Sequence, residues 1–151
     1  MSTPDLTIRP MRIDDYEAVH ALWLSCKGMG LNDIDDSREG IDRYLRRNPS
    51  TCFVAQCGGE IAGVIMAGHD GRRGYIYHIA VWEVYRGRGI GSRLVARALD
   101  ALKEEGIAKA ALVVFSRNDA GNTFWEKQGF TTREDLIYRN RTLVQMVRKE
   151  T

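Results

Sequence analysis

Apolar residues in the first third of the chain recur at the spacing of amphipathic helices. Residues 6–9 alternate like a short strand that Pro10 ends. Asp14, with Glu17 three positions on, predicts the cap of a helix that stops near Gly28. Its apolar face consists of Tyr16, Val19, Leu22 and Trp23. A polar, acidic loop at 30–36 leads to a second predicted helix, which begins near residue 36 and ends before Pro49.

The pattern then changes to the shorter period of strands. Runs at 52–55, 61–67 and 75–81 are strand-like. Gly58 and Gly59 between the first two predict a hairpin turn, because glycine supplies the positive φ that such turns need. A second turn at 70–74 joins the next pair. We therefore expect three consecutive antiparallel strands.

Helix and strand alternate in the second half of the chain. A glycine-rich run at 86–91 opens a long helix that ends at Gly106, and 110–115 is a nearly all-apolar strand. A strand reached across a helix is expected to be parallel to its predecessor and buried on both faces. A short helix at 119–128 ends at Gly129, and strand-like runs follow at 131–137 and 143–147. The order βααβββαβαββ predicts one α/β domain over 1–151, a mixed sheet of about seven strands flanked by about four helices.

Composition narrows the class of protein. The chain has 151 residues, 44% of them hydrophobic and 28% charged, with a net charge of +2. Basic and acidic residues are interspersed, so the sequence has no basic patch of the kind that binds nucleic acid. No apolar run is long enough to span a bilayer. The first fourteen residues lack the pattern of a secretory signal, so we expect a cytoplasmic protein. Cys26, Cys52 and Cys57 show no metal-ligand spacing; we expect reduced thiols and no metal site.

The glycine-rich run carries the first candidate chemistry. It lies between an apolar strand and a helix, whose first amides have no intrahelical partner and carry the positive end of the helix dipole. Glycines at 87, 89 and 91 remove the Cβ atoms that would keep a phosphate away from those amides. Arg86 and Arg88 add positive charge. The run predicts a pyrophosphate cradle; the alternative is a loop that serves only a tight strand-to-helix turn.

Spacing excludes the two common nucleotide loops. A P-loop needs four residues between its glycines and then Gly-Lys-Ser/Thr, which is absent. In a dinucleotide-binding fold the third glycine would come one residue later, and an acidic residue would stand at a strand end about 20 positions on. Here Glu104 and Glu105 fall on the helix instead.

Two motifs together resemble a known superfamily. Residues 85–91, Tyr-Arg-Gly-Arg-Gly-Ile-Gly, resemble the acyl-CoA signature Arg/Gln-x-x-Gly-x-Gly/Ala of the GCN5-related N-acetyltransferases (GNAT). Asn118, Ala120 and the run 124–130, Phe-Trp-Glu-Lys-Gln-Gly-Phe, resemble its second motif. The order of elements also fits, so the resemblance covers most of the chain. Residues 68–74 are similar to those of a bacterial YpeA-like subgroup.

The resemblance implies acetyl-CoA as co-substrate and assigns its contacts. The pantetheine arm would bond the backbone of Ile79, Ala80 and Val81, with one amide polarising the thioester carbonyl. The pyrophosphate would lie on the residues of the predicted cradle, which are Arg86, Gly87, Arg88, Gly89, Ile90, Gly91 and Ser92. Asn118 would contact the pantetheine amides; the alternative is that it only caps the following helix. Trp125 stands where the family usually has tyrosine and is expected to line the CoA channel or the core.

The sequence offers candidate residues for the general acid and the general base of the reaction. The indole of Trp125 cannot protonate a leaving thiolate, which departs readily in any case at its ordinary pKa. Strand alternation places Tyr75, Tyr77 and Ile79 on one face and His78 with Ala80 on the other. Tyr77, on the face expected to look into the acceptor cleft, and His78, for its convenient pKa, are the candidate catalytic residues. The alternative for His78 is a packed, hydrogen-bonded side chain.

The acceptor is expected to lie between the first two helices and the last hairpin. Asn32, Asp33, Asp35 and Asp36 form an acidic edge there that suits a cationic amine, although aspartates also favour loops and caps. Tyr138 is a further candidate for the cleft. We therefore predict an N-acetyltransferase in which an amine, on a small molecule or a protein, attacks the thioester directly. The alternative is an acyl-CoA sensor without turnover. Neither nucleic acid nor membrane is an expected partner, and the resemblance allows a homodimer.

Overall fold

Residues 5–149 are described in the computed structural model, and their main sheet has the strand order β1-β3-β4-β5-β6. These strands are β1 (Leu6–Pro10), β3 (Phe53–Cys57), β4 (Glu60–His69), β5 (Gly74–Val81) and β6 (Ala110–Ala111). Neighbours from β1 to β5 are antiparallel, whereas β6 is parallel to β5. The predicted mixed sheet and its antiparallel run are confirmed, as is the Gly58–Gly59 turn, where both residues have positive φ.

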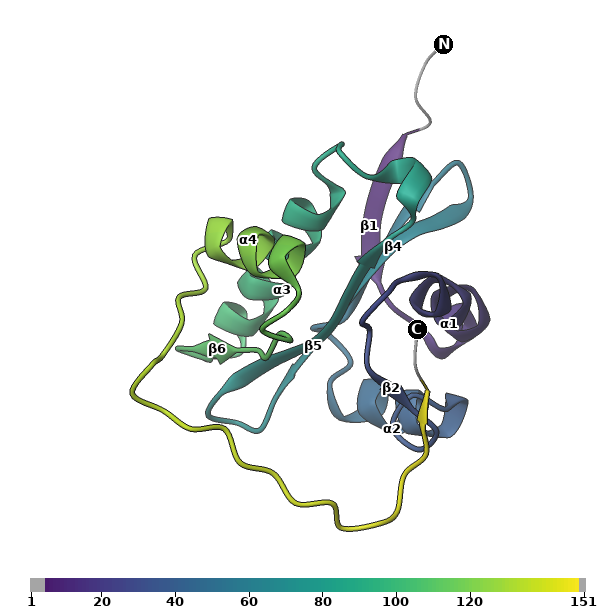
Figure 1. The fold of residues 1–151 in the computed structure, drawn as a ribbon. Coiled ribbons are helices and arrows are strands. Elements are labelled where there is room, and N and C mark those ends of the chain that lie inside the picture. The colour runs from purple at the N-terminus through teal and green to yellow at the C-terminus, as the bar shows by residue number, and fades with distance from the viewer. Residues whose placement is uncertain (1–4, 150–151) are drawn as a thin grey trace.

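Helices cover both faces of this sheet (Figure 1). On one face lie α1 (Tyr16–Ser25), which follows a 3-10 turn at Ile13–Asp15, and α2 (Arg38–Arg47). On the other lie α3 (Ile90–Glu104) and α4 (Asp119–Lys127). Val19, Leu22 and Trp23 are fully buried, so the predicted apolar face of the first helix is confirmed. Among residues 5–149, no helix is both long and apolar enough to cross a membrane.

A bulge in β5 changes the predicted alternation of its side chains. Met66 pairs with His78 and the next residue of β4 pairs with Ile76, which leaves Tyr77 as an extra residue. Tyr77 and His78 therefore both face α1 and α2, where the Tyr77 ring contacts Tyr44 and the His78 ring contacts Trp23. Ile79 packs with the core beneath α3. The predicted grouping of Tyr77 with Ile79 is wrong, whereas the placement of His78 with Ala80, opposite Ile79, is confirmed.

β5 and β6 separate soon after they meet. Their pairing consists of Gly74 with Ala110 and Tyr75 with Ala111, so the strand predicted at 110–115 is paired over two residues only. The expected burial on both faces is also wrong, because Val113 is 57% exposed. Diverging from β5 removes the partner that would hold 112–115 in a ladder and opens a wedge between the two segments.

The C-terminal part of the chain leaves the sheet. The strands predicted at 131–137 and 143–147 are absent; instead β7 (Arg148–Lys149) pairs with β2 (Leu31–Asn32) in a separate small sheet. Figure 1 shows this segment, in yellow, running from α4 round to the side of the molecule that carries β2. All residues from 131 to 149 are exposed. A strand-like sequence forms a strand only beside a free edge, and this path takes 131–147 away from β6.

Candidate active site

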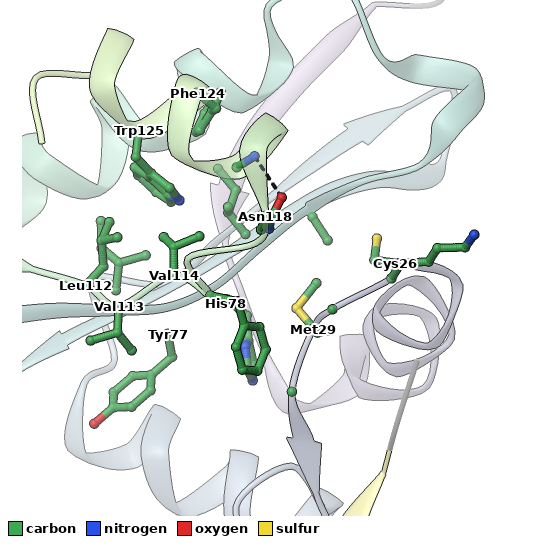
Figure 2. A pocket seen from close by; sticks show the side chains of 18 of the residues that line it. Cys26, Met29, Tyr77, His78, Leu112, Val113, Val114, Asn118, Phe124 and Trp125 are labelled. Carbon is green, nitrogen blue, oxygen red and sulfur yellow. Dashed lines mark hydrogen bonds between the residues drawn. The ribbon is translucent and has the colours of Figure 1, made fainter. Parts of the chain in front are cut away.

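The wedge between β5 and the segment after β6 is a cavity of about 1230 Å³. Its lining includes residues 75–81, residues 112–115, Asn118 and the start of α3. Beyond Tyr75, β5 has no strand partner on this edge, so its remaining peptide groups on that side face the cavity. Figure 2 shows Trp125, Val114 and Asn118 on one side of this space and Met29 and Cys26 on the other. The shape suits a long ligand that lies along β5 and completes its hydrogen bonding.

One end of the cavity is the predicted phosphate cradle, residues 86–92. Gly87 and Gly89 have φ of 79° and 77°, and Gly89 is the N-cap of α3. A Cβ at either glycine would meet no protein atom within 4 Å, so their role is to permit the turn and leave space open. Gly91 differs, because its Cβ would lie 3.2 Å from the Phe124 ring. Close packing of α3 on α4 thus explains Gly91, rather than access for a ligand.

The two arginines of the cradle are held in different ways. The Arg86 Nε donates to the Val81 carbonyl at 2.9 Å, and its Nη2 approaches the Cys26 sulfur at 3.7 Å. Arg86 therefore ties the end of β5 to the loop after α1 and keeps its charge at the cavity wall. The Arg88 guanidinium lies over the Tyr85 ring at 5.6 Å and does not line the cavity. Ser92, which does, accepts a hydrogen bond from Gln128.

Asn118 and Trp125 come to the cavity from α4. The Asn118 Oδ1 accepts the Gly121 amide at 2.9 Å, so this residue caps α4 and lines the cavity at the same time. Trp125 is 8% exposed and meets the rings of Phe124 and Phe130 edge-on. It is both core and cavity wall, the two alternatives that its position left open.

His78 forms a buried pair with an aspartate from the other layer. Its Nε2 is 2.8 Å from Asp36 Oδ1, and the side chains are 11% and 6% exposed. The other Asp36 oxygen accepts the Asn32 amide at 2.8 Å, and the Asp36 carbonyl accepts the Tyr16 hydroxyl. The Trp23 ring contacts the imidazole edge-on at 4.9 Å. This pair was not predicted, since no local pattern links positions 42 residues apart.

The tautomer of His78 follows from this pairing. A carboxylate oxygen only accepts, so Asp36 holds the ring proton on Nε2. The Nδ1 atom is then a lone-pair acceptor, and it is buried with no hydrogen-bond partner among the described residues. His78 also lines the cavity, where the wedge meets the α1 layer.

Tyrosines occupy the neighbouring part of the cavity. The rings of Tyr75 and Tyr77 are 4.6 Å apart, and Tyr138 of the C-terminal segment lines the same space. Burial, followed by the charge of Asp35 and the proximity of Tyr138, raises the pKa of Tyr77 above its usual value. Tyr77 therefore keeps its proton at neutral pH and offers a donor, which leaves His78 as the better proton acceptor of the two predicted residues.

The residues of the acidic edge mainly make hydrogen bonds that stabilise their own loop. Asn32 lines the cavity, whereas Asp33 and Asp35 do not. Asp33 accepts the Val147 amide at 2.6 Å, and Asp35 accepts the Asn32 side-chain amide at 3.1 Å. Their role toward an acceptor stays a prediction.

Other catalytic chemistries find little support in the described residues. Among them, no cluster of three or more histidine, cysteine or acidic side chains could hold a metal ion. Cys26, Cys52 and Cys57 are buried, and none of them forms a disulfide with another described residue. Burial raises the pKa of Cys52 to about 12, so this thiol does not supply a thiolate near neutral pH.

A family model described as the acetyltransferase (GNAT) family matches residues 16–130, more than half of the chain. The chain belongs to this family. An acetyltransferase of Sodalis glossinidius (strain morsitans) is 35% identical over 140 residues, covering 93% of this chain and 97% of the relative. One of Photorhabdus laumondii is 38% identical over 141 residues, covering 92% and 97%. The predicted superfamily is confirmed, and this GNAT protein is an acyltransferase with acetyl-CoA as co-substrate.

Solved structures share the fold of this GNAT chain. The PaiA N-acetyltransferase of Thermoplasma acidophilum, in complex with coenzyme A, has a TM-score of 0.74 at 19% identity, covering 97% of this chain and 99% of that one. AAC(6')-Iy in complex with a bisubstrate analogue has a TM-score of 0.70 at 20% identity, covering 91% and 99%. At these identities the likeness concerns the fold. Membership of the YpeA-like subgroup stays a prediction.

Proposed function

We propose that this protein is a single-domain N-acetyltransferase that moves the acetyl group of acetyl-CoA to a primary amine by direct attack in a ternary complex. One observation carries the proposal: a continuous cavity joins the phosphate cradle to His78 along the unpaired edge of β5. Donor and acceptor can therefore meet without a covalent enzyme intermediate. We keep a cytoplasmic location, and the absence of nucleic-acid and membrane partners, as parts of the same proposal.

The chain binds the donor through backbone groups and the first turn of α3. Peptide groups of Ile79, Ala80 and Val81 bond the pantetheine as a neighbouring strand would, and one amide donates to the thioester carbonyl. First-turn amides of α3 bind the pyrophosphate, with the charge of Arg86 beside them. The Asn118 side-chain Nδ2 donates to the pantetheine, since its Oδ1 is engaged in the cap. Trp125 forms the wall of the channel.

His78 takes the proton that the amine loses. The amine nitrogen attacks the thioester carbon, the C–S bond breaks, and the amine proton passes to the free lone pair on His78 Nδ1, directly or through one water. Asp36 keeps Nε2 protonated and stabilises the imidazolium that forms. Tyr77 donates a hydrogen bond within the acceptor space. The CoA thiolate departs without an acid from the protein, because its ordinary pKa makes it a good leaving group.

The acceptor enters on the side of the cavity formed by Asn32, the tyrosines and the C-terminal segment. Tyr138 and Asn32 contact it directly, while Asp33 and Asp35 shape the loop and add negative charge behind it. A primary amine with an apolar or aromatic body fits the rings of Tyr75 and Tyr77.

Thiol release tests this function. The protein is incubated with acetyl-CoA and a panel of amines, including amino acids, polyamines and peptides, and free CoA thiol is titrated. We expect amine-dependent release that stops in Gly89→Glu, which places bulk and negative charge in the cradle. Gly71→Glu is the matched control, since Gly71 also has positive φ and open surroundings but lies outside the cavity. Unchanged CoA affinity in Gly89→Glu contradicts the cradle. CoA binding without release by any amine favours an acyl-CoA sensor.

A further inference from the structure

A second, smaller cavity of about 320 Å³ adjoins the main one and is here called the basic cavity. Its lining within residues 5–149 includes no carboxylate, and it includes four basic side chains, which are Lys27, Arg117, Arg148 and Lys149. Phe115 and Asn118 line both cavities, so a ligand in the main cavity can extend into the basic one. None of the chemistry described so far uses this space.

Three segments that are distant in the sequence bring these cations together. Lys27 follows α1, and Arg117 immediately precedes the cap of α4. Arg148 and Lys149 form β7, which is held beside β2 by strand pairing (Figure 1). Like charges gathered at one cavity repel one another, and an anion bound among them is stabilised by all of them.

The ring of Phe115 orients two of the guanidinium groups. The Cζ atom of Arg117 lies 4.4 Å from the ring centroid, and that of Arg148 lies 5.5 Å from it. Stacking on an aromatic ring restrains a guanidinium and leaves its N–H groups available at the edge, where their fork matches a carboxylate or a phosphate. Within residues 5–149, neither Lys27 nor Arg117 forms an ion pair with a carboxylate. The cavity is therefore preorganised to bind an anion.

The basic cavity is joined to the acceptor side of the site rather than to the phosphate cradle. None of residues 86–92 lines it. Arg148 pairs with Asn32, and the Asn32 amide donates to the Asp36 carboxylate that holds His78. An anion in this cavity thus lies beside the loop that positions the proposed proton acceptor. We expect it to belong to the molecule that brings the amine.

We propose that the basic cavity binds a carboxylate or phosphate carried by the acceptor, so that the acceptor is an amine with an anionic group elsewhere in the molecule. This assignment of substrate class rests on the proposed acetyl transfer. Neither Asp33 nor Asp35 lines either cavity, so the lining offers the acceptor cations rather than the predicted acidic edge. Cations near the amine also disfavour its ammonium form, and only the neutral amine attacks the thioester.

Matched acceptors of increasing length test the proposal. Thiol release is measured at saturating acetyl-CoA with ω-amino carboxylates from glycine to ε-aminocaproate, each beside its uncharged amide. Aminoalkyl phosphates are compared with the corresponding amino alcohols in the same way. At the length that spans the two cavities, we expect kcat/KM for the anionic acceptor to exceed that of its neutral partner about 10- to 100-fold.

Variants of the basic cavity locate the origin of this preference. Arg117→Gln, alone and together with Lys27→Gln, is expected to remove most of it by raising KM for the anionic acceptors, with little change for the neutral ones. Arg97→Gln is the matched control, because the Arg97 guanidinium also lies over a phenylalanine ring, 5.1 Å from the centroid of Phe53, but lines neither cavity. Arg97→Gln should keep the full preference.

The donor is tested as the other possible source of the anion. KM for acetyl-CoA and for acetyl-dephospho-CoA, which lacks the ribose phosphate, is measured in wild type and in Arg117→Gln. We expect the ratio of the two values to be the same in both proteins. A ratio that changes in Arg117→Gln assigns the cations to the phosphate of the donor and overturns the proposal.

Three further results would overturn it. Acids and their amides could react equally at every length in both series, the preference could persist in the double variant, or Arg97→Gln could lose it to the same extent. Calorimetric titration of the N-acetylated acids into the complex with CoA tests the cavity without turnover. If no amine releases thiol, acetyl transfer is contradicted, whereas binding of these acids that weakens about 10-fold in Arg117→Gln still supports the anion site; equal binding by both proteins, or none, refutes it.

Discussion

Replacing Asp36 by asparagine tests the assignment of His78 as proton acceptor. In wild type, one Asp36 oxygen accepts from His78 Nε2 and the other accepts the Asn32 amide. An asparagine can keep only one of these interactions. If its oxygen continues to accept the Asn32 amide, its NH₂ group faces Nε2 and the ring proton moves to Nδ1. The lone pair that receives the amine proton is then lost.

The size of the effect follows from the bond that is removed. A hydrogen bond to a charged group contributes about 1.5–3 kcal/mol, and the bond between Asp36 and His78 becomes one when the imidazolium forms. At 1.36 kcal/mol for each factor of ten, kcat falls by about 10- to 150-fold. The KM for acetyl-CoA stays near the wild-type value, since Asp36 does not line the cavity. A merely structural role would change KM and thermal stability together with kcat.

The assay is the steady-state rate of thiol release across a pH series, with thermal melting beside it. Asp42→Asn is the control, because Asp42 lies on α2 and pairs with Arg46 away from the cavity. We expect kcat to fall in Asp36→Asn only, at every pH of the series. A kcat within a factor of about two of wild type, in a variant that melts normally, would refute the assignment of His78.

Two further predictions concern stability. Burial of Asp15 acts to raise its pKa, but hydrogen bonds from the Arg9 side chain and the Arg12 amide outweigh it, so the folded pKa lies below the usual value. The ionised Asp15 therefore stabilises the fold at pH values above its unfolded-state pKa of about 4. This stabilisation is lost as the pH falls through the lower pKa of Asp15 in the folded protein. Urea unfolding should show Asp15→Asn to be about 1–2 kcal/mol less stable than wild type at pH 7, with a smaller difference at pH 3; an equal difference at both contradicts the linkage. Gly40→Ala places a Cβ 2.3 Å from the Ile34 carbonyl oxygen and 2.5 Å from that of Asp35. Although alanine favours helices, we expect a loss of about 1–3 kcal/mol in urea unfolding and a fall in kcat as the loop before Asp36 shifts; wild-type stability would show that the loop yields freely.

Local patterns predicted the parts of this fold that depend on neighbours in sequence. The apolar face of α1 and the hairpin at Gly58 and Gly59 need only periodicity and positive φ. The glycine-rich turn that opens α3 was also predictable from local pattern, and its binding of a pyrophosphate stays a prediction. The order of elements then indicated a mixed sheet, and the comparisons confirm the family.

The features that sequence missed depend on partners distant in the chain. The pair of Asp36 with His78 joins two layers, and neither residue carries a local signal of the other. The residues at 131–147 have the composition of strands, but they pass beside no free edge of the sheet. Strand propensity reflects fit to a neighbouring strand, so it cannot report whether that neighbour is present.

The bulge at Tyr77 determines how β5 can contact the donor along its edge and present His78 on its face. Without it, His78 would lie on the same face as Ile76, which packs beneath α3, and could not reach Asp36. With it, Tyr77 and His78 both face the layer of α1 and α2, while the backbone that follows still presents its free edge to the wedge. One strand thus carries the proposed donor contacts along its edge and the proposed proton acceptor on its face, a residue apart. Deleting Tyr77 should restore regular pairing and keep His78, which pairs with Met66, on the face of Asp36. Thiol release should therefore be weakened by the loss of the Tyr77 side chain but not abolished; complete loss, in a variant that still binds CoA, would show that the bulge itself sets the position of His78.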